Sequence, residues 1–324
     1  MVAAMFDYLV NKVVAAEIGQ EPFEHIYIDN FLSDEHFSAV TSAREIALQP
    51  QSNDHALLES LFDLGYKIVN FPGCITDMEK YVAWHQDNTT HTKHHSACEG
   101  FGMTLRLVEA SSSVLQELSA FLQSEAWNQA LASKFGISLA ETYVDNGVQK
   151  YLDGYEISPH PDIRRKALTF MVNINPHTDS ESREHHTQYL KLKPEFKYVQ
   201  TFWESNETCE RCWLPWDWCE TVWTQSKNNS AVIFSPSNNT LHGVKAVYDH
   251  LTAQRTQLYG NLWYRDVPDF TVVEWEAFDV KNHSVNRLPL SHRAFRALPK
   301  FLRNPLKQLV LPDSKNVIRD RKKF

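Results

Sequence analysis

Short runs of alternating or β-branched hydrophobic residues follow one another from Thr142 to about Tyr264, with turn residues between them. Alternation with a period of two is typical of strands with one buried face, and many short strands in succession predict a β-barrel or β-roll. This pattern limits the chain to a mainly β fold. The candidate strands are Thr142–Tyr151, Leu168–Ile174, Thr187–Leu192, Ser230–Phe234 and Gln257–Tyr264.

The part of the chain before Gly136 has a different pattern, in which helices flank isolated strands. The elements predicted there are a helix over Met5–Ala16, a strand at Phe23–Tyr27, a helix after the N-cap Ser33, a polar loop over 76–98, a strand over 99–109, and helices at Ser112–Leu122 and Ser124–Phe135. The fold class that follows is mainly β with flanking helices.

A chain of 324 residues, 43% of them hydrophobic, can bury a substantial core. We expect a single domain over 1–284, with an N-terminal part (1–140) and a β core (141–270) that carries an insertion (177–225). The 10 glycines form no phosphate-binding loop, which argues against glycine-based nucleotide sites. The first residues do not have the pattern of a signal peptide, and no apolar run is long enough to span a membrane, so we expect a cytoplasmic protein.

Charge is divided unevenly along the chain. The net charge is −8, but residues 285–324 contain 11 basic and two acidic residues, a net of +9, so the remainder carries −17. A basic tail on an acidic body predicts an anionic partner or docking on the body, and a solvated basic surface is the alternative. Apolar residues among the bases would allow peripheral contact with an anionic membrane, although packing on the domain is more common. We expect no nucleic-acid partner.

A cysteine-rich and tryptophan-rich stretch lies inside the insertion. Cys209 and Cys212 form a CxxC pair, Cys219 follows, and with His185 or His186 they could complete a zinc site. We favour the alternative, three thiols in an aromatic loop, because a second ligand pair is missing. The nearby tryptophans either line a substrate cleft or pack in the interior. They are Trp203, Trp213, Trp216, Trp218 and Trp223.

The most specific chemical signal lies in the segment 149–176. His160 and Asp162 are two residues apart, and in an extended segment such residues point to the same face, so both side chains can reach one ion. His242 follows the candidate strand Ser230–Phe234 and can supply a third ligand. Two histidines and one carboxylate leave three positions of an iron ion open, which is the geometry of non-haem iron(II) oxygenases.

A cation lies downstream of this ligand set. Arg255 follows His242 by 13 residues and begins a candidate strand. A guanidinium group can bind a carboxylate through two parallel hydrogen bonds, as the distal carboxylate of 2-oxoglutarate would require.

These residues and their flanks resemble the prolyl-4-hydroxylase-like branch of the iron(II)/2-oxoglutarate-dependent oxygenases. The resemblance implies a double-stranded β-helix (jelly-roll) core with helices packed outside it and the metal in its open mouth. It covers much of 22–48 and 142–264. The matching stretches are PFEHIYIDNFLSDEHF, YLDGYEISPHPD, KALTFMVNINP, NNSAVIFSPSNNTLHGVKAV and RTQLYGNLWY.

The resemblance also implies roles for individual residues. His160, Asp162 and His242 match the iron ligands, and Arg255 matches the residue that binds 2-oxoglutarate. Tyr151 lies where the family often has a tyrosine near the co-substrate, although a core tyrosine is an equal alternative. The chain departs from the family in two places. Asn173 stands where a tyrosine is common and could donate a hydrogen bond to 2-oxoglutarate, and the Gly-Gly pair that precedes the distal histidine is missing.

The implied reaction is O2-dependent hydroxylation of an unactivated C–H bond, with 2-oxoglutarate converted to succinate and CO2. The carboxylate of Asp162 favours hydroxylation over halogenation, because related halogenases have a small residue there. We expect a small-molecule or glycan-type substrate that is recognised by the 177–225 insertion. The alternatives are a protein or peptide side-chain hydroxylase of the same fold and a zinc-bearing, non-catalytic binding module. The oligomeric state stays open.

Overall fold

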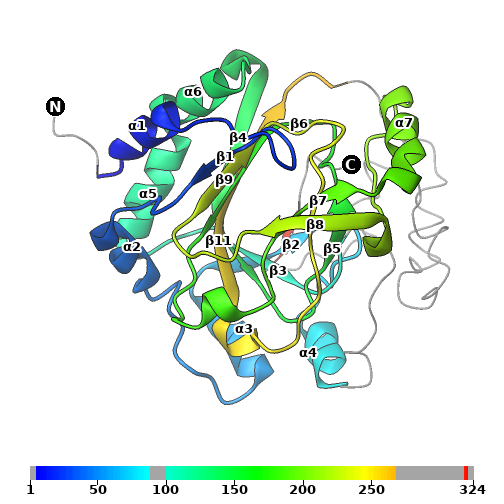
Figure 1. The fold of residues 1–324 in the computed structure, drawn as a ribbon. Helices are drawn as coiled ribbons and strands as arrows, with labels where there is room; N and C mark the ends of the chain where they lie inside the picture. Colours follow the sequence, from blue (N-terminus) through cyan, green and yellow to red (C-terminus); the bar gives the residue numbers. More distant parts are fainter. Residues whose placement is uncertain (1–4, 88–99, 268–316, 320–324) are drawn as a thin grey trace, which may run out of the picture.

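Two β-sheets and a layer of helices make up the fold, as the computed structural model of residues 5–87, 100–267 and 317–319 shows (Figure 1). The larger sheet has eight strands and the smaller has four, and all pairings but one are antiparallel. The large sheet consists, in spatial order, of β1 (Ile26–Ile28), β9 (Ala231–Phe234), β6 (Lys166–Asn173), β11 (Arg255–Tyr264), β4 (Thr142–Tyr151), β3 (Thr104–Leu107), β2 (Tyr66–Asn70) and β12 (Val317–Arg319). The small sheet consists of β5 (Ile157–His160), β10 (His242–Val244), β7 (Gln188–Leu192) and β8 (Cys219–Thr224).

Helices cover the outer face of the large sheet. In Figure 1, α1, α2, α5 and α6 lie to the left of this sheet, and the small sheet lies on its other side. Outward side chains such as Leu168, Phe170 and Leu258 pack with these helices in the main core cluster. The helices are α1 (Tyr8–Ala15), α2 (Asp34–Thr41), α3 (Asp54–Asp63), α4 (Met78–Gln86), α5 (Ser113–Gln123), α6 (Glu125–Lys134) and α7 (Lys197–Ser205). Among the described helices, none is both long enough and apolar enough to cross a lipid bilayer.

The inner face of the large sheet is polar, and it faces the small sheet. Gln149 and Tyr151 of β4 alternate with the outward Val148 and Lys150, as the period-two pattern requires. A compact aromatic cluster joins the two sheets near β9. Its buried members are Phe23, Met171, Tyr189, Val232 and Phe234. Beside this cluster, the polar inner face of the large sheet lies opposite the small sheet.

Most of the predicted elements are confirmed within a few residues, and Thr142–Tyr151 agrees at both ends. Ser33 is the N-cap of α2, where its side chain accepts a hydrogen bond from the His36 N–H. The loop predicted for 76–98 is wrong in its first half, because Asp77 caps α4 (Met78–Gln86) by accepting from the Lys80 N–H. Residues 88–99 lie outside the described part of the chain.

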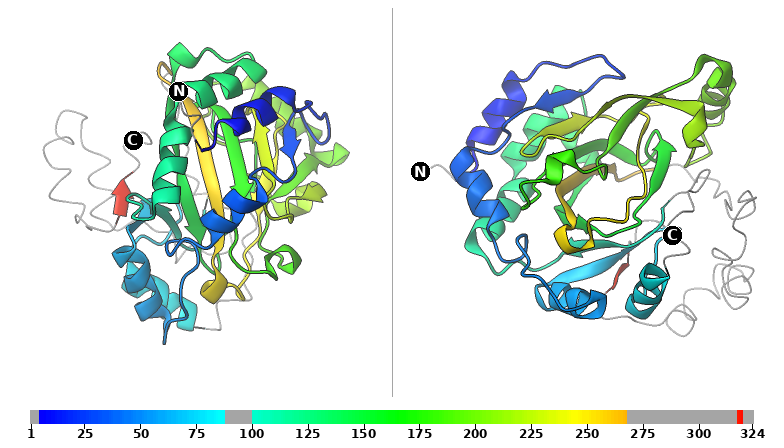
Figure 2. Two further views of the ribbon diagram at one scale, coloured as in Figure 1. Left: turned by 90° about the vertical axis from the view of Figure 1, so that its left-hand side faces the viewer. Right: turned by 60° about the horizontal axis from the view of Figure 1, so that its bottom comes forward.

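The insertion contributes to the small sheet itself. Residues 177–225 contain β7, α7 and β8, and Figure 2 shows α7 at the end of the molecule away from α1. Of the basic tail (285–324), only Val317–Arg319 is described, as the strand β12 parallel to β2. The membrane contact predicted for this tail therefore lies outside the described residues.

Candidate metal centre

His160, Asp162 and His242 come together between the two sheets. His160 ends β5 and His242 begins β10, and the two are cross-strand partners with ring centroids 4.3 Å apart. Asp162 Oδ1 lies 3.7 Å from His160 Nε2, and Asp162 Oδ2 lies 3.9 Å from His242 Nε2. All three residues are buried, and their ligand atoms lie within 4.8 Å of one another. Within residues 5–87 and 100–267, no other set of three histidine, cysteine or acidic residues is close enough to share a metal ion.

The backbone brings Asp162 to the histidines in an unexpected way. The extended conformation predicted for the His160–Asp162 pair stops at His160, where β5 ends. Asp162 itself has a φ of +69°, a left-handed conformation that aspartate tolerates better than most residues. The pairing of the two side chains therefore depends on a turn at Asp162 and not on strand alternation.

Both histidines present Nε2 to the space between them. Nδ1 of His160 donates to the Ser158 carbonyl at 2.8 Å, and Nδ1 of His242 donates to the Thr240 carbonyl at 2.9 Å. Because a carbonyl can only accept, each Nδ1 carries a proton, and this leaves Nε2 as the ring nitrogen that could bind a metal. Burial and the neighbouring His160 lower the pKa of His242 to about 3, which keeps its imidazole in the neutral, ligating form.

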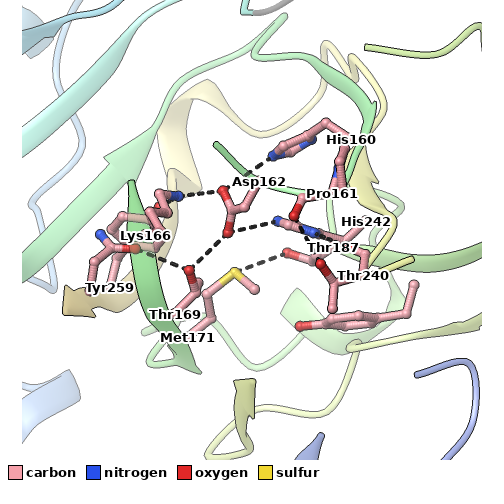
Figure 3. Close-up of polar contacts among 12 residues, drawn as sticks. His160, Pro161, Asp162, Lys166, Thr169, Met171, Thr187, Thr240, His242 and Tyr259 are labelled. Carbon is pink, nitrogen blue, oxygen red and sulfur yellow. Dashed lines mark hydrogen bonds and ion pairs between the residues drawn. The ribbon is translucent and has the colours of Figure 1, made fainter. Parts of the chain in front are cut away.

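Side chains of the large sheet hold the carboxylate of Asp162. Thr169 of β6 donates to Oδ2 at 2.8 Å, and the Lys166 ammonium pairs with Oδ1 and also donates to Tyr259 at 2.8 Å. Figure 3 shows Lys166, Thr169 and Tyr259 on one side of Asp162 and the two histidines on the other. Burial alone would raise the pKa of Asp162, but Lys166 and the histidines hold it well below its usual range. The carboxylate is therefore charged and fixed.

Arg255 is a buried cation on the same inner face. It begins β11 opposite Tyr151, and its guanidinium carbon lies 4.6 Å from the centre of the Tyr151 ring. Nη2 donates to Thr187 at 2.6 Å, but Nε has no hydrogen-bond partner in the described part of the chain. A buried guanidinium with an unused N–H fits an anionic ligand, and a carboxylate is the usual partner.

Tyr189 shows that Arg255 and Asp162 face a common space. Burial raises the pKa of the Tyr189 hydroxyl, Arg255 acts to lower it, and Asp162 acts to raise it further. One hydroxyl group therefore lies within electrostatic range of both charged residues. Thr187, which accepts from Arg255, lies two residues before Tyr189, the cross-strand partner of His242, so the predicted co-substrate residue lies near the predicted metal ligands.

Asn173 does not contribute to this site. Its amide nitrogen donates to the carbonyls of Gln225 and Lys227, at 2.8 and 3.1 Å, and its oxygen accepts from Gln257 at 2.8 Å. Both N–H groups are occupied by backbone carbonyls, so the hydrogen bond predicted from Asn173 to 2-oxoglutarate has no support in these contacts. Tyr151, in contrast, lies directly against Arg255.

The insertion packs on β5, the strand that ends at His160. The ring of Trp213 stacks near His160, with centroids 6.5 Å apart at 22°, and the Leu214 N–H donates to the Pro159 carbonyl at 2.9 Å. The Arg164 guanidinium lies 3.8 Å from the centre of the Trp203 ring. The sequence analysis missed Arg164, although two arginines directly after the His160–Asp162 pair are a signal that this turn is anchored from outside.

The cysteines of the insertion do not form a ligand set with the nearby histidines. Cys212 and Cys219 belong to an apolar cluster, and burial raises the pKa of each thiol to about 12. His185 instead packs against His186 and His250, with ring centroids 4.7 and 4.8 Å away. Nothing in the described residues therefore supports the zinc hypothesis.

Comparisons with known proteins found no matching family model and no similar curated protein. Among solved structures, a prolyl-4-hydroxylase from Pseudomonas putida is similar to this protein. The match covers 81% of this chain and 100% of the hydroxylase, with 10% identity and a TM-score of 0.39. A Trichoplax adhaerens prolyl hydroxylase, solved with a fragment of hypoxia inducible factor, matches 80% of this chain and 90% of its own, with 12% identity and a TM-score of 0.39. A 2OG-Fe(II) oxygenase from Burkholderia pseudomallei matches 69% of this chain and 98% of its own, at 9% identity and a TM-score of 0.30. These neighbours belong to the family that the sequence resembles, but at such scores the functional argument depends on the site alone.

Proposed function

We propose that this protein is an iron(II)- and 2-oxoglutarate-dependent dioxygenase that hydroxylates a C–H bond of a small-molecule or glycan-type substrate and releases succinate and CO2. One observation carries the proposal. Two histidines that present Nε2 and one fixed carboxylate lie close together, and a buried arginine with an unused N–H lies near them. In this proposal, the two sheets are the halves of a double-stranded β-helix with the metal between them.

Each residue of the site has a definite task in this reaction. His160 Nε2, His242 Nε2 and one oxygen of Asp162 would hold iron(II) and leave three positions open for the co-substrate and O2. Arg255 would bind the distal carboxylate of 2-oxoglutarate through its unused N–H, and Thr187 would hold the guanidinium group in place by accepting from Nη2. When bound, the iron and 2-oxoglutarate supply the oxidising chemistry, and the protein supplies orientation and exclusion of water.

Lys166 and Thr169 fix the carboxylate of Asp162 so that one ligand geometry is kept through the reaction. The buried ring of Tyr151 lies against the guanidinium group of Arg255 and would keep water from it. This shielding strengthens the attraction between the arginine and an anionic ligand, because charges interact more strongly in a medium of low dielectric constant.

Aromatic residues of the insertion support the proposed substrate class. Trp213 stacks on a metal ligand, and the half-buried Trp216 donates to Glu156 at 3.1 Å. Aromatic rings that border a polar site are suited to bind sugars or ring compounds. No described residue favours the zinc-bearing binding module, so we propose no second function.

The proposal is tested by following succinate. The purified protein with Fe(II) and 2-oxoglutarate should form succinate only when O2 is present, and a library of small molecules, glycans and peptides should contain compounds that accelerate it. His160→Ala should form none, whereas His55→Ala, which changes an exposed histidine beside Glu59 and Glu79, should behave as the wild type. Wild-type protein that forms no succinate under any of these conditions would refute the function.

A further inference from the structure

A row of four aromatic rings crosses the inner face of the small sheet. His160, His242, Tyr189 and Trp223 are successive cross-strand partners on β5, β10, β7 and β8. Because directly opposite residues share a face, all four rings point into the interior. Two of the rings are the proposed iron ligands, so the other two lead away from the metal.

The row continues to the surface, and neighbouring rings in it are close together. His242 and Tyr189 are stacked with centroids 6.3 Å apart, and Tyr189 and Trp223 are stacked with centroids 4.1 Å apart at 20°. Trp223 meets Tyr27 of β1 edge-on at 5.9 Å. Tyr27 is 41% exposed, so the row ends at the protein surface. An unbroken series of rings thus joins a proposed metal ligand to solvent.

The chemical identity of these rings sets them apart from ordinary packing. Tyrosine and tryptophan are the aromatic side chains that lose one electron most readily, whereas phenylalanine does not do so. The same cluster contains Phe23 and Phe234 beside the row, so apolar packing there does not require oxidisable rings. The hydroxyl of Tyr189 donates to Gln225 at 3.1 Å, which gives this buried phenol a fixed partner.

We propose that Tyr189, Trp223 and Tyr27 form an electron-transfer path that reduces the metal site when O2 is activated without a substrate. This inference rests on the proposed function, which supplies the oxidant, a metal-centred species formed from O2 and 2-oxoglutarate. Two electrons, one at a time, would leave the phenol of Tyr27 and pass through Trp223 and Tyr189 to the metal site, which would take up two protons from water and return to iron(II). Each time, the phenolic proton of Tyr27 is released to water, and a thiol or ascorbate in solution returns the electron and a proton. The site is thereby protected from oxidising its own ligands.

The test follows the path with electron paramagnetic resonance. Protein with Fe(II) and 2-oxoglutarate, but without substrate, is mixed with O2 and frozen at intervals, and succinate is measured in each sample. The wild type should show a transient organic radical, and mass spectrometry after prolonged turnover should find oxidation at Tyr27. Trp223→Phe should lose the surface radical, inactivate severalfold faster and carry its oxidation at Tyr189 or the metal ligands.

Two further variants separate the path from a structural effect. Trp223→Tyr restores an oxidisable ring and should restore the radical and the slow inactivation. Tyr198→Phe changes a tyrosine that is 61% exposed and lies off the path, and it should match the wild type. Succinate without any organic radical, or equal inactivation rates in Trp223→Phe and the wild type, would overturn the path alone. Absence of succinate would overturn the proposed function and the path with it.

Discussion

The two walls of the site hold their functional groups in different ways. On the small sheet, each histidine is oriented by a backbone carbonyl two residues earlier in the chain, Ser158 for His160 and Thr240 for His242. On the large sheet, side chains do the orienting, and Asp162 depends on Lys166 and Thr169. The first is the histidine wall, and the second, which holds the buried ion pair of Asp162 and Lys166, is the charged wall.

This difference predicts unequal tolerance to mutation. A backbone carbonyl is present whatever the side chain is, so the histidine wall should survive changes in the residues that orient it. The charged wall loses its geometry when one orienting side chain is removed, because buried charges must be paired and hydrogen-bonded. The following experiments test this contrast, from the largest expected effect to the smallest.

Loss of a ligand itself should have the largest effect on either wall. His242→Ala removes one of three protein ligands, so its iron(II) affinity should fall by more than the roughly 10–100-fold that loss of an outer hydrogen-bond partner costs. Anaerobic competition with a chromophoric chelator measures this affinity. A variant that keeps wild-type affinity would show that His242 is no ligand.

Removal of the buried cation should act on the co-substrate and not on the metal. Arg255→Met should weaken binding of 2-oxoglutarate by about 2–5 kcal/mol, the cost of leaving a buried charge unpaired, while iron(II) affinity stays unchanged. Arg255→Lys keeps the charge but loses the bidentate geometry, so its affinity for 2-oxoglutarate should lie between those of the wild type and Arg255→Met. Anaerobic titration gives both constants. Equal 2-oxoglutarate affinity in Arg255→Met and the wild type would remove this residue from the co-substrate site.

The contrast between the walls is sharpest in a matched pair of hydroxyl deletions. Thr169→Val removes the hydroxyl that donates to Asp162, so iron(II) affinity should fall roughly 10–100-fold. Ser158→Ala keeps the carbonyl that orients His160, so affinity should change less than twofold by the same chelator assay. Comparable losses in the two variants would contradict the proposed difference.

Acid should act on a buried histidine outside the two walls, His186. Burial, with a contribution from Arg255, lowers the pKa of His186 to about 4, so the folded state keeps it neutral while the unfolded state binds a proton near its ordinary value. The unfolded state therefore binds more protons between about pH 6.5 and pH 4, and stability falls as pH is lowered through this window.

For this one histidine the loss should reach about 1 kcal/mol at pH 5.5. Urea unfolding of metal-free protein at pH 7 and pH 5.5 measures it, with His186→Gln as the comparison, since glutamine can also donate to the Ser180 carbonyl. Between pH 7 and pH 5.5, the free energy of unfolding should fall by about 1 kcal/mol less in His186→Gln than in the wild type. An equal loss in both proteins would show that His186 is not held neutral.

The parts that the sequence predicted well are those that depend on local pattern. The period-two alternation of Thr142–Tyr151 placed β4 at its observed ends, and the Ser33 cap placed the start of α2. The order of His160, Asp162 and His242 identified three residues that lie together in the structure, and their role as iron ligands stays a prediction. For the strand and the cap, residues near in sequence carry enough information, because strand alternation and capping are local effects.

The parts that failed depend on contacts between distant segments. Asn173 was assigned to the co-substrate, but its amide is taken up by Gln225 and Lys227 from the far end of the insertion. Lys166 passed unnoticed, since its pairing with Tyr259 joins β6 to β11 across 93 positions. The roles of the basic tail and the boundaries of the single domain stay predictions.

The most direct test of the central claim is an anaerobic spectrum. Addition of 2-oxoglutarate to the Fe(II)-loaded protein should produce a weak visible charge-transfer band, because the claim requires co-substrate and iron to meet between His160, Asp162 and His242. The band should be absent in His160→Ala and should require much more 2-oxoglutarate in Arg255→Met. A wild-type protein that binds Fe(II) and 2-oxoglutarate without this band, or a band that persists unchanged in His160→Ala, would contradict the account.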